Sequence, residues 1–168
     1  MLRNRVIGIV LAVLFAPALA QAGVLPPIYI HMNGGNYFLE PVVALRPGQK
    51  VVFVNQDTDA HTIVGYKAAT GALSRRFNGT LFGTKGPADK VSTYAISFAK
   101  PGVQPYFCSV HAVLAKTRGK AVQPAKRMGT HGFKGPMAGL ILVTTDRALL
   151  AQNPPTTQER IVKDFFGG

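Results

Sequence analysis

The feature that most constrains the fold of this chain is a succession of short segments that are either apolar throughout or alternate between apolar and polar residues. Residues that favour turns separate these segments. The segments are residues 28–32, 42–45, 50–55, 61–64, 94–98, 103–108 and 140–144. Turn dipeptides such as Pro47-Gly48 and Pro101-Gly102 lie between them, and these punctuate strands more often than helices. We therefore expect an all-β fold, an antiparallel sandwich or barrel of about seven or eight strands.

Two longer stretches lack this pattern. Residues 66–90 contain several glycines and are expected to form a long loop. Residues 112–136 are basic, contain Gly and Pro, and show little periodicity, which predicts a loop insertion on the surface. After the main domain, residues 147–168 form a C-terminal tail, in which we expect a short helix over 147–152 that Pro154-Pro155 stops.

The N-terminal residues 1–22 have the pattern of a secretory leader. Arg3 and Arg5 precede an apolar run, and Ala20-Gln21-Ala22 fits a small-x-small cleavage site. The apolar run is short for a membrane span. We therefore expect a cleaved signal peptide and a periplasmic protein; the alternative is a retained N-terminal anchor that would tie the protein to the membrane.

The chain is strongly basic. It has 19 Lys and Arg against seven Asp and Glu. Without Arg3 and Arg5, 17 basic residues face seven acidic ones, a net charge of +10. Nucleic acid is a poor explanation for an exported protein. Steering toward acidic partners and stability at low pH, where few native carboxylates can be protonated, both remain open.

Cys108 is the chain's one cysteine, so no intramolecular disulfide can form. It follows a predicted strand and begins the sequence Cys108-Ser109-Val110-His111. A thiolate and an imidazole presented from one tight loop suit copper or zinc. His61 and Met137 lie at the ends of other strands, which a sandwich can bring to the same pole. Two imidazoles, a thiolate and a weak thioether are the ligands of a blue-copper electron-transfer site.

In three motifs the chain resembles the cupredoxins, near amicyanin, pseudoazurin and plastocyanin. They are Phe38-x-x-Pro41 with Pro47-Gly48, Val52-x-Val54-Asn55-x-Asp57 and His61; Pro101-Gly102 with Tyr106-Phe107-Cys108-Ser109-Val110-His111; and Met137-Ala138-Gly139-Leu140-Ile141-Leu142-Val143. The resemblance covers about residues 28–65 and 91–144 and makes residues 23–146 the cupredoxin domain.

This resemblance implies a Greek-key β-sandwich with one type 1 copper ion, held by His61, Cys108, His111 and the long axial ligand Met137. It also implies that the Thr62 amide hydrogen-bonds the thiolate. The function implied is single-electron shuttling between respiratory partners, a c-type cytochrome or a terminal cytochrome oxidase with an acidic docking surface. The protein would be a monomer and not an enzyme, and an acidophile's oxidase-associated cupredoxin fits its charge.

One departure from the family concerns the axial ligand. In the family the second His and the Met lie close together, whereas 25 residues separate His111 from Met137 here. The entropic cost of closing a loop rises only slowly with its length, so the insertion does not prevent Met137 from binding the metal. We still expect Met137 as the axial ligand, because Gly139 and the last strand follow it in register. Met128 and His131, inside the insertion, are the rivals. His31 and His131 are otherwise expected to be surface or structural residues.

Three other functions compete with electron transfer. A multicopper enzyme needs further sites, usually built from His-x-His pairs, and none occurs among the four histidines. A copper carrier or storage module is the main alternative, although such proteins tend to be richer in Met and His. A structural zinc site could use the same ligands. For a copper site we also expect a fairly high potential, because Val110 offers a backbone N–H to the Cys108 sulfur.

Overall fold

The computed structural model describes residues 25–32, 34–86, 89–130, 135–155 and 157. The elements are β1 (Ile28–Met32), β2 (Val42–Leu45), β3 (Lys50–Asn55), β4 (His61–Tyr66), β5 (Leu73–Leu81), β6 (Ser92–Ser97), β7 (Gly102–Phe107), β8 (Ala112–Lys116), β9 (Val122–Lys126), β10 (Ala138–Val143) and α1 (Arg147–Leu150). The expected leader at 1–22 and the end of the tail lie outside the described residues. Within them, no helix is long and apolar enough to cross a membrane.

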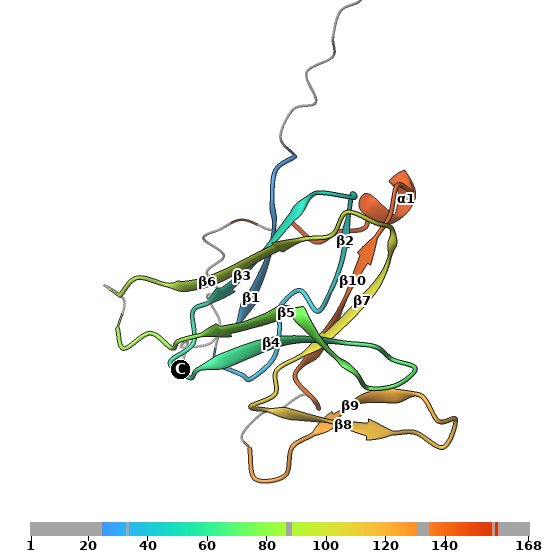
Figure 1. Ribbon diagram of the computed structural model, residues 1–168. Helices are drawn as coiled ribbons and strands as arrows, with labels where there is room; N and C mark the ends of the chain where they lie inside the picture. Colours follow the sequence, from blue (N-terminus) through green and yellow to red (C-terminus); the bar gives the residue numbers. More distant parts are fainter. Residues whose placement is uncertain (1–24, 33, 87–88, 131–134, 156, 158–168) are drawn as a thin grey trace, which may run out of the picture.

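The strands form a sandwich with a hairpin beside it (Figure 1). One sheet has the order β1-β3-β6, the other has the order β2-β10-β7-β4-β5, and β8 pairs only with β9. The all-β expectation is confirmed. The antiparallel pairs β3–β6, β4–β7 and β7–β10 join strands that are not consecutive in sequence, as a Greek-key arrangement requires.

Aromatic side chains from both sheets fill the centre of the sandwich. The ring of Tyr106, from β7, lies 5.1 Å from that of Phe53, from β3, and 4.9 Å from that of Phe38. Phe77, from β5, lies 5.8 Å from Tyr106. Each such pair adds about 0.5–1.5 kcal/mol beyond the burial of its area. This core fixes the two sheets against each other, and with them the strand ends that carry the candidate ligands.

Two of the strand pairings correct the expectation of a purely antiparallel sandwich. β1 runs parallel to β3, and β2 runs parallel to β10. Parallel neighbours need a crossover between them instead of a tight hairpin, and the chain supplies it by passing from one sheet to the other between successive strands.

Two stretches expected to be loops contain strands. The stretch 66–90 includes β5, which pairs along β4. Within β5 only Phe77 and Leu81 are buried, so its hydrophobic pattern is too sparse to indicate a strand. The insertion 112–136 includes the hairpin of β8 and β9, whose pattern is interrupted by Pro124 and exposed cations. β5 and β9 are surface strands whose polar side chains conceal the period of two, and β8 has only a short continuous apolar run that shows no alternation.

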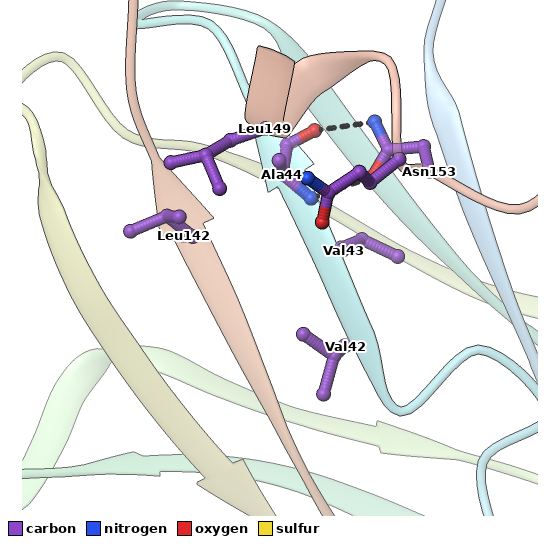
Figure 2. A pocket seen from close by; sticks show the side chains of 7 residues that line it. Val42, Val43, Ala44, Leu142, Leu149 and Asn153 are labelled. Atoms are coloured by element: carbon purple, nitrogen blue, oxygen red, sulfur yellow. Dashed lines mark hydrogen bonds between the residues drawn. The ribbon is translucent and has the colours of Figure 1, made fainter. Parts of the chain in front are cut away.

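The short helix expected at 147–152 is found as α1, where it helps to cover an edge of the larger sheet. Its N-cap is Asp146, whose carboxylate accepts hydrogen bonds from the amides of Ala148 and Leu149. Farther on, the side chain of Asn153 bonds both the amide and the carbonyl of Ala44 on the edge strand β2, as Figure 2 shows for the carbonyl. An edge strand with free backbone groups invites pairing with another chain, and Asn153 occupies one pair of these groups.

His31 is structural, one of the two roles expected for it. It lies fully buried on β1 beside the fully buried Glu40. The Oε2 atom of Glu40 accepts a hydrogen bond from the His31 amide at 2.8 Å and lies 3.2 Å from His31 Nδ1. The carboxylate therefore joins the segment before β2 to β1 through both the backbone and the side chain of one residue.

Candidate metal centre

Three strand ends meet at one pole of the sandwich. His61 is the first residue of β4, Cys108 follows the end of β7, and Met137 precedes β10. β7 pairs antiparallel with both β4 and β10, with Phe107 opposite Val64 and opposite Ala138. Since the end of one antiparallel strand lies beside the start of its neighbour, the three candidate ligands are brought to the same edge.

The fourth residue, His111, reaches this pole through a tight turn. The carbonyl of Cys108 accepts hydrogen bonds from the amides of His111, at 3.2 Å, and Ala112, at 2.8 Å. Such a turn places residues i and i+3 on the same side. A Cys-x-x-His sequence can therefore present its sulfur and its imidazole together before the chain continues into β8.

His61, Cys108 and His111 form a compact buried cluster. Each offers one ligand atom, and these atoms all lie within 4.8 Å of one another. The Cys108 Sγ atom lies 3.7 Å from His61 Nδ1 and 3.4 Å from His111 Nδ1. His61 and Cys108 are fully buried and His111 is 8% exposed. The structure thus brings together three of the four residues that the sequence singled out.

These distances fit a single metal ion between the three atoms. Metal–nitrogen bonds of about 2.0 Å and metal–sulfur bonds of about 2.3 Å, at an angle between tetrahedral and trigonal, separate the two ligand atoms by about 3.5–3.7 Å. The observed separations of 3.4 and 3.7 Å lie close to that range. Little movement of the side chains is needed for all three to bind one ion.

The electrostatics of the cluster favour a thiolate. Burial alone would raise the pKa of Cys108, but hydrogen bonds with His61, the Thr62 amide and His111 outweigh it and lower the pKa to about 6. Burial alone would also lower the pKa of His61, but hydrogen bonds with Asp57 and Cys108 raise it to about 9. Metal-free protein near neutral pH therefore holds an ion pair whose sulfur is already in the form that binds metal.

Asp57 fixes the orientation of the His61 ring. The His61 Nε2–H group donates to Asp57 Oδ2 at 3.0 Å, which turns Nδ1, the nitrogen that binds metal after it loses its proton, toward the sulfur. The carboxylate is itself held, because the Asp57 amide donates to Asn55 Oδ1 and the Asp59 amide approaches Asp57 Oδ1. A ligating histidine commonly donates its second ring nitrogen to a carboxylate, which raises its basicity and sets its angle.

Thr62 connects the His61 strand to the ligand loop. Its amide donates to the Cys108 sulfur at 3.3 Å, the hydrogen bond that the family resemblance implied. Its hydroxyl accepts from the Ser109 amide at 2.7 Å and lies 3.7 Å from the sulfur. The second sulfur hydrogen bond, expected from the Val110 amide, is not found in the described part of the chain, so the ground for a high potential is weaker than expected.

The structure places Met137 beside Cys108. The Cys108 amide donates to the Met137 carbonyl at 2.9 Å, and Met137 is 1% exposed within the same buried cluster as Cys108. Two residues on, Gly139 is required by packing, since a Cβ atom there would collide with the Tyr106 hydroxyl and the Pro41 carbonyl. This close approach seats the start of β10, and Met137 with it, firmly at the pole.

Met128 and His131 are the two alternatives to Met137 as axial ligand. Met128 is 92% exposed at the end of the hairpin, whereas a ligand of a buried cluster has to be buried with it. His131 lies outside the described residues. The axial role of Met137 stays a prediction. The burial of Met137 next to Cys108 favours it.

Two residues of the site were not identified from the sequence. Asp57 appeared only as part of a motif, although an acid four residues before a candidate ligand histidine is a usable signal. Arg127 was counted only as a surface cation, yet its Nη2 atom donates to the Ser109 carbonyl at 2.8 Å and its amide donates to the His111 carbonyl at 3.2 Å. Only tertiary structure shows that this residue returns to the ligand loop.

Comparisons with known proteins find matches among solved structures but none among family models or curated proteins. Among solved structures, an amicyanin from Paracoccus versutus is 20% identical, with a TM-score of 0.45 over 76% of this chain and 87% of the amicyanin. A purple cupredoxin from Nitrosopumilus maritimus is 18% identical, with a TM-score of 0.45 over 70% of this chain and 99% of that protein.

These similarities are loose, so the identity of the metal has to come from the donor atoms themselves. Two imidazole nitrogens and one buried thiolate, with a buried methionine adjacent, are donors that suit one copper ion. The cluster of His61, Cys108 and His111 is a donor set of the kind found in type 1 copper centres.

Proposed function

We propose that this protein binds one type 1 copper ion through His61, Cys108, His111 and Met137 and carries single electrons. The observation that carries the proposal is the buried cluster in which two imidazole Nδ1 atoms lie 3.4 and 3.7 Å from one sulfur. A bound copper ion supplies a one-electron change between Cu(I) and Cu(II). The chain's own contribution is to hold the donor atoms in nearly the same place in both states.

Copper is favoured over structural zinc by the fourth donor. Structural zinc sites are usually closed by four Cys or His ligands in a tetrahedron. In the described residues, the cluster contains only three Cys, His, Asp or Glu donors, and the nearby Asp57 carboxylate is already bonded to the far side of the His61 ring. Met137, which is buried in the same cluster as Cys108, offers a thioether, a soft donor that suits copper.

Electron transfer is favoured over catalysis by the burial of the ligands. A copper enzyme must keep a coordination position open to its substrate, whereas His61 and Cys108 are fully buried and Met137 nearly so. His111 is the most exposed of the four proposed ligand residues, at 8%. An electron can pass through the edge of that ring without any substrate entering the site.

The setting of this activity is part of the proposal. The pattern of residues 1–22 supports export to the periplasm through a cleaved signal peptide, with a membrane-retained form as the alternative. There the protein would exchange electrons between respiratory partners, of which a c-type cytochrome or a terminal cytochrome oxidase suits a soluble single-electron carrier. The excess of basic residues supports partners with acidic surfaces.

Optical and EPR spectra of the copper-loaded mature protein test this function. A thiolate bound to Cu(II) gives an intense visible charge-transfer band that disappears on reduction and returns on reoxidation. A colourless protein whose Cys108 thiol stays freely titratable after copper loading would refute it. Replacing Met137 with Leu should keep the band but shift its position and the potential, and unchanged spectra would remove Met137 from the ligand set.

A further inference from the structure

The β8–β9 hairpin begins and ends at the ligand loop. β8 starts directly after His111, and the residue after β9 is Arg127. The backbone and side chain of Arg127 hydrogen-bond the carbonyls of His111 and Ser109, respectively. The base of the hairpin is therefore tied to the loop that carries two of the candidate metal ligands.

The hairpin is also held along its length, against the outer side of the five-stranded sheet (Figure 1). Ala112 packs in a small apolar cluster with Val64 and Phe107, which lie on two strands of that sheet. At the far end, the Val122 amide donates to the Ala68 carbonyl in the turn after β4 at 2.7 Å. With both ends anchored, the hairpin presents its outer surface in a fixed direction.

That outer surface is positively charged. Its exposed cations are Lys116, Arg118, Lys120, Lys126 and Arg127. The sequence contains no acidic residue between Asp89 and Asp146. No acidic residue of the hairpin itself therefore offsets its positive charge. The positive charge extends to Arg127, which hydrogen-bonds the loop that carries His111.

Exposed apolar side chains lie at the base of the same hairpin. Val110, inside the ligand loop, is 41% exposed, and Met128, directly after Arg127, is 92% exposed. Exposed apolar residues at the base of a positively charged hairpin, beside the loop that carries His111, supply the two components of a transient protein interface, an apolar contact region and charged residues. A membrane surface would use the cations but has no need of contact with His111.

We propose that the β8–β9 hairpin, together with Val110 and Met128, is the docking surface for an acidic face of a redox protein, oriented so that His111 lies within the contact. This inference rests on the proposed electron-transfer function. A five-residue strand is about 16 Å long, and a standard interface of about 800 Å² per partner is about 30 Å across. One partner therefore covers both the hairpin and the ring edge of His111.

Charge reversal at the hairpin tests the proposal. The variant carries Lys116→Glu, Arg118→Glu and Lys120→Glu, none of which bonds the ligand loop. The matched control carries Arg46→Glu, Lys50→Glu and Lys100→Glu, three exposed residues that adjoin the start of β3, at the opposite pole. Both variants change the net charge equally, so any difference between them reports the position of the charges.

The probe is a reduced plant-type two-iron ferredoxin, an acidic redox protein, mixed with the copper-loaded protein in stopped flow. At low salt the hairpin variant should be reduced at least tenfold more slowly than wild type, and the control variant less than threefold more slowly. Salt should slow the wild type and remove the difference. In amide NMR of the metal-free protein, ferredoxin should shift signals of residues 110–128. Equal slowing in both variants, or shifts elsewhere, would overturn the proposal.

Two further arms separate the other outcomes. If an excess of dithionite fails to reduce the copper-loaded wild type, the proposed function fails and not only the docking surface. If the hairpin variant loses binding to phosphatidylglycerol vesicles while its rate with ferredoxin is unchanged, the surface is a membrane contact, and the docking proposal is wrong.

Discussion

The described part of the chain contains two buried histidine–carboxylate pairs, and one of them lies in the candidate metal site. His61 and His31 are both fully buried. His61 Nε2 lies 3.0 Å from Asp57, and His31 Nδ1 lies 3.2 Å from Glu40. Chemically the pairs are alike, so a buried histidine with a carboxylate partner does not by itself indicate a functional site.

The difference lies in the second ring nitrogen. The second nitrogen of His61, Nδ1, hydrogen-bonds the Cys108 sulfur, whereas His31 Nε2 has no hydrogen-bond partner within the described part of the chain. His61 begins a strand at the pole, and His31 lies within a strand opposite Val54. A strand end can meet loops from other strands, while a position inside the ladder meets only its packed neighbours. Place in the fold, more than residue type, therefore separates a ligand from a structural histidine.

The largest expected effect comes from replacing each histidine in turn. His61→Leu removes one of three close donors, so the visible thiolate-to-copper band should be lost. His31→Leu should keep the band with its position unchanged, but lower the free energy of unfolding by about 1–3 kcal/mol, because Glu40 loses a buried partner. Optical spectra and urea unfolding of both variants decide this. Loss of the band in His31→Leu, with the protein still folded, would break the comparison.

The next effect separates the two carboxylates. Asp57→Asn keeps the shape of the side chain but weakens the acceptor for His61 Nε2–H, and loss of such a partner typically weakens metal binding by about 10–100-fold. Glu40→Gln should change the copper dissociation constant by less than about twofold. Competition titrations against a copper chelator measure both. If both variants weakened copper binding equally, the hydrogen bond between His61 and Asp57 would have no specific effect on the metal site.

The sequence predicted the sandwich because its core strands alternate or are continuously apolar, as in residues 50–55 and 140–144. It missed β5 and the β8–β9 hairpin because their exposed faces are polar and only a few positions, such as Phe77 and Val122, are buried. Parallel pairing of β1 with β3 was also missed, because the direction of pairing depends on the path of the chain and not on the pattern of one strand.

At the site, the spacing Cys108-x-x-His111 was informative because both residues come from one turn. The contributions of Asp57 and Arg127 were not, since each acts through a hydrogen bond whose partner no local pattern reveals. The role of His31 was open for the same reason, because its burial beside Glu40 depends on packing between β1 and the segment before β2.

The third prediction concerns the pH dependence of metal-free protein. The pKa of Cys108 falls from 9.0 to about 6 on folding, so its contribution to stability grows as the pH rises from about 6 to 9. The pKa of His61 rises from 6.5 to about 9, so its contribution is complete below pH 6.5 and is lost as the pH rises to about 9. Between about pH 6.5 and 9 the two slopes cancel, and the stability from this pair should be flat.

Cys108→Ser removes the rising contribution and leaves His61 paired with Asp57. The free energy of unfolding should then fall by up to about 1.4 kcal/mol per pH unit above pH 6.5. Urea unfolding at several pH values measures these slopes, and a flat profile for Cys108→Ser would show that Asp57 alone does not hold the pKa of His61 above its ordinary value.

The smallest expected effect concerns neutral hydrogen bonds at the pole. Thr62→Val removes the hydroxyl that accepts from the Ser109 amide at 2.7 Å but keeps the backbone amide that donates to the sulfur. A single neutral hydrogen bond contributes about 0.5–1.5 kcal/mol, so unfolding should become easier by about that amount while the copper band is kept. If Thr62→Val instead weakened copper binding as much as Asp57→Asn, restraint of the ligand loop would matter as much as the orientation of His61. The contrast between the two histidine pairs would then rest on the loop that meets His61 and not on its carboxylate.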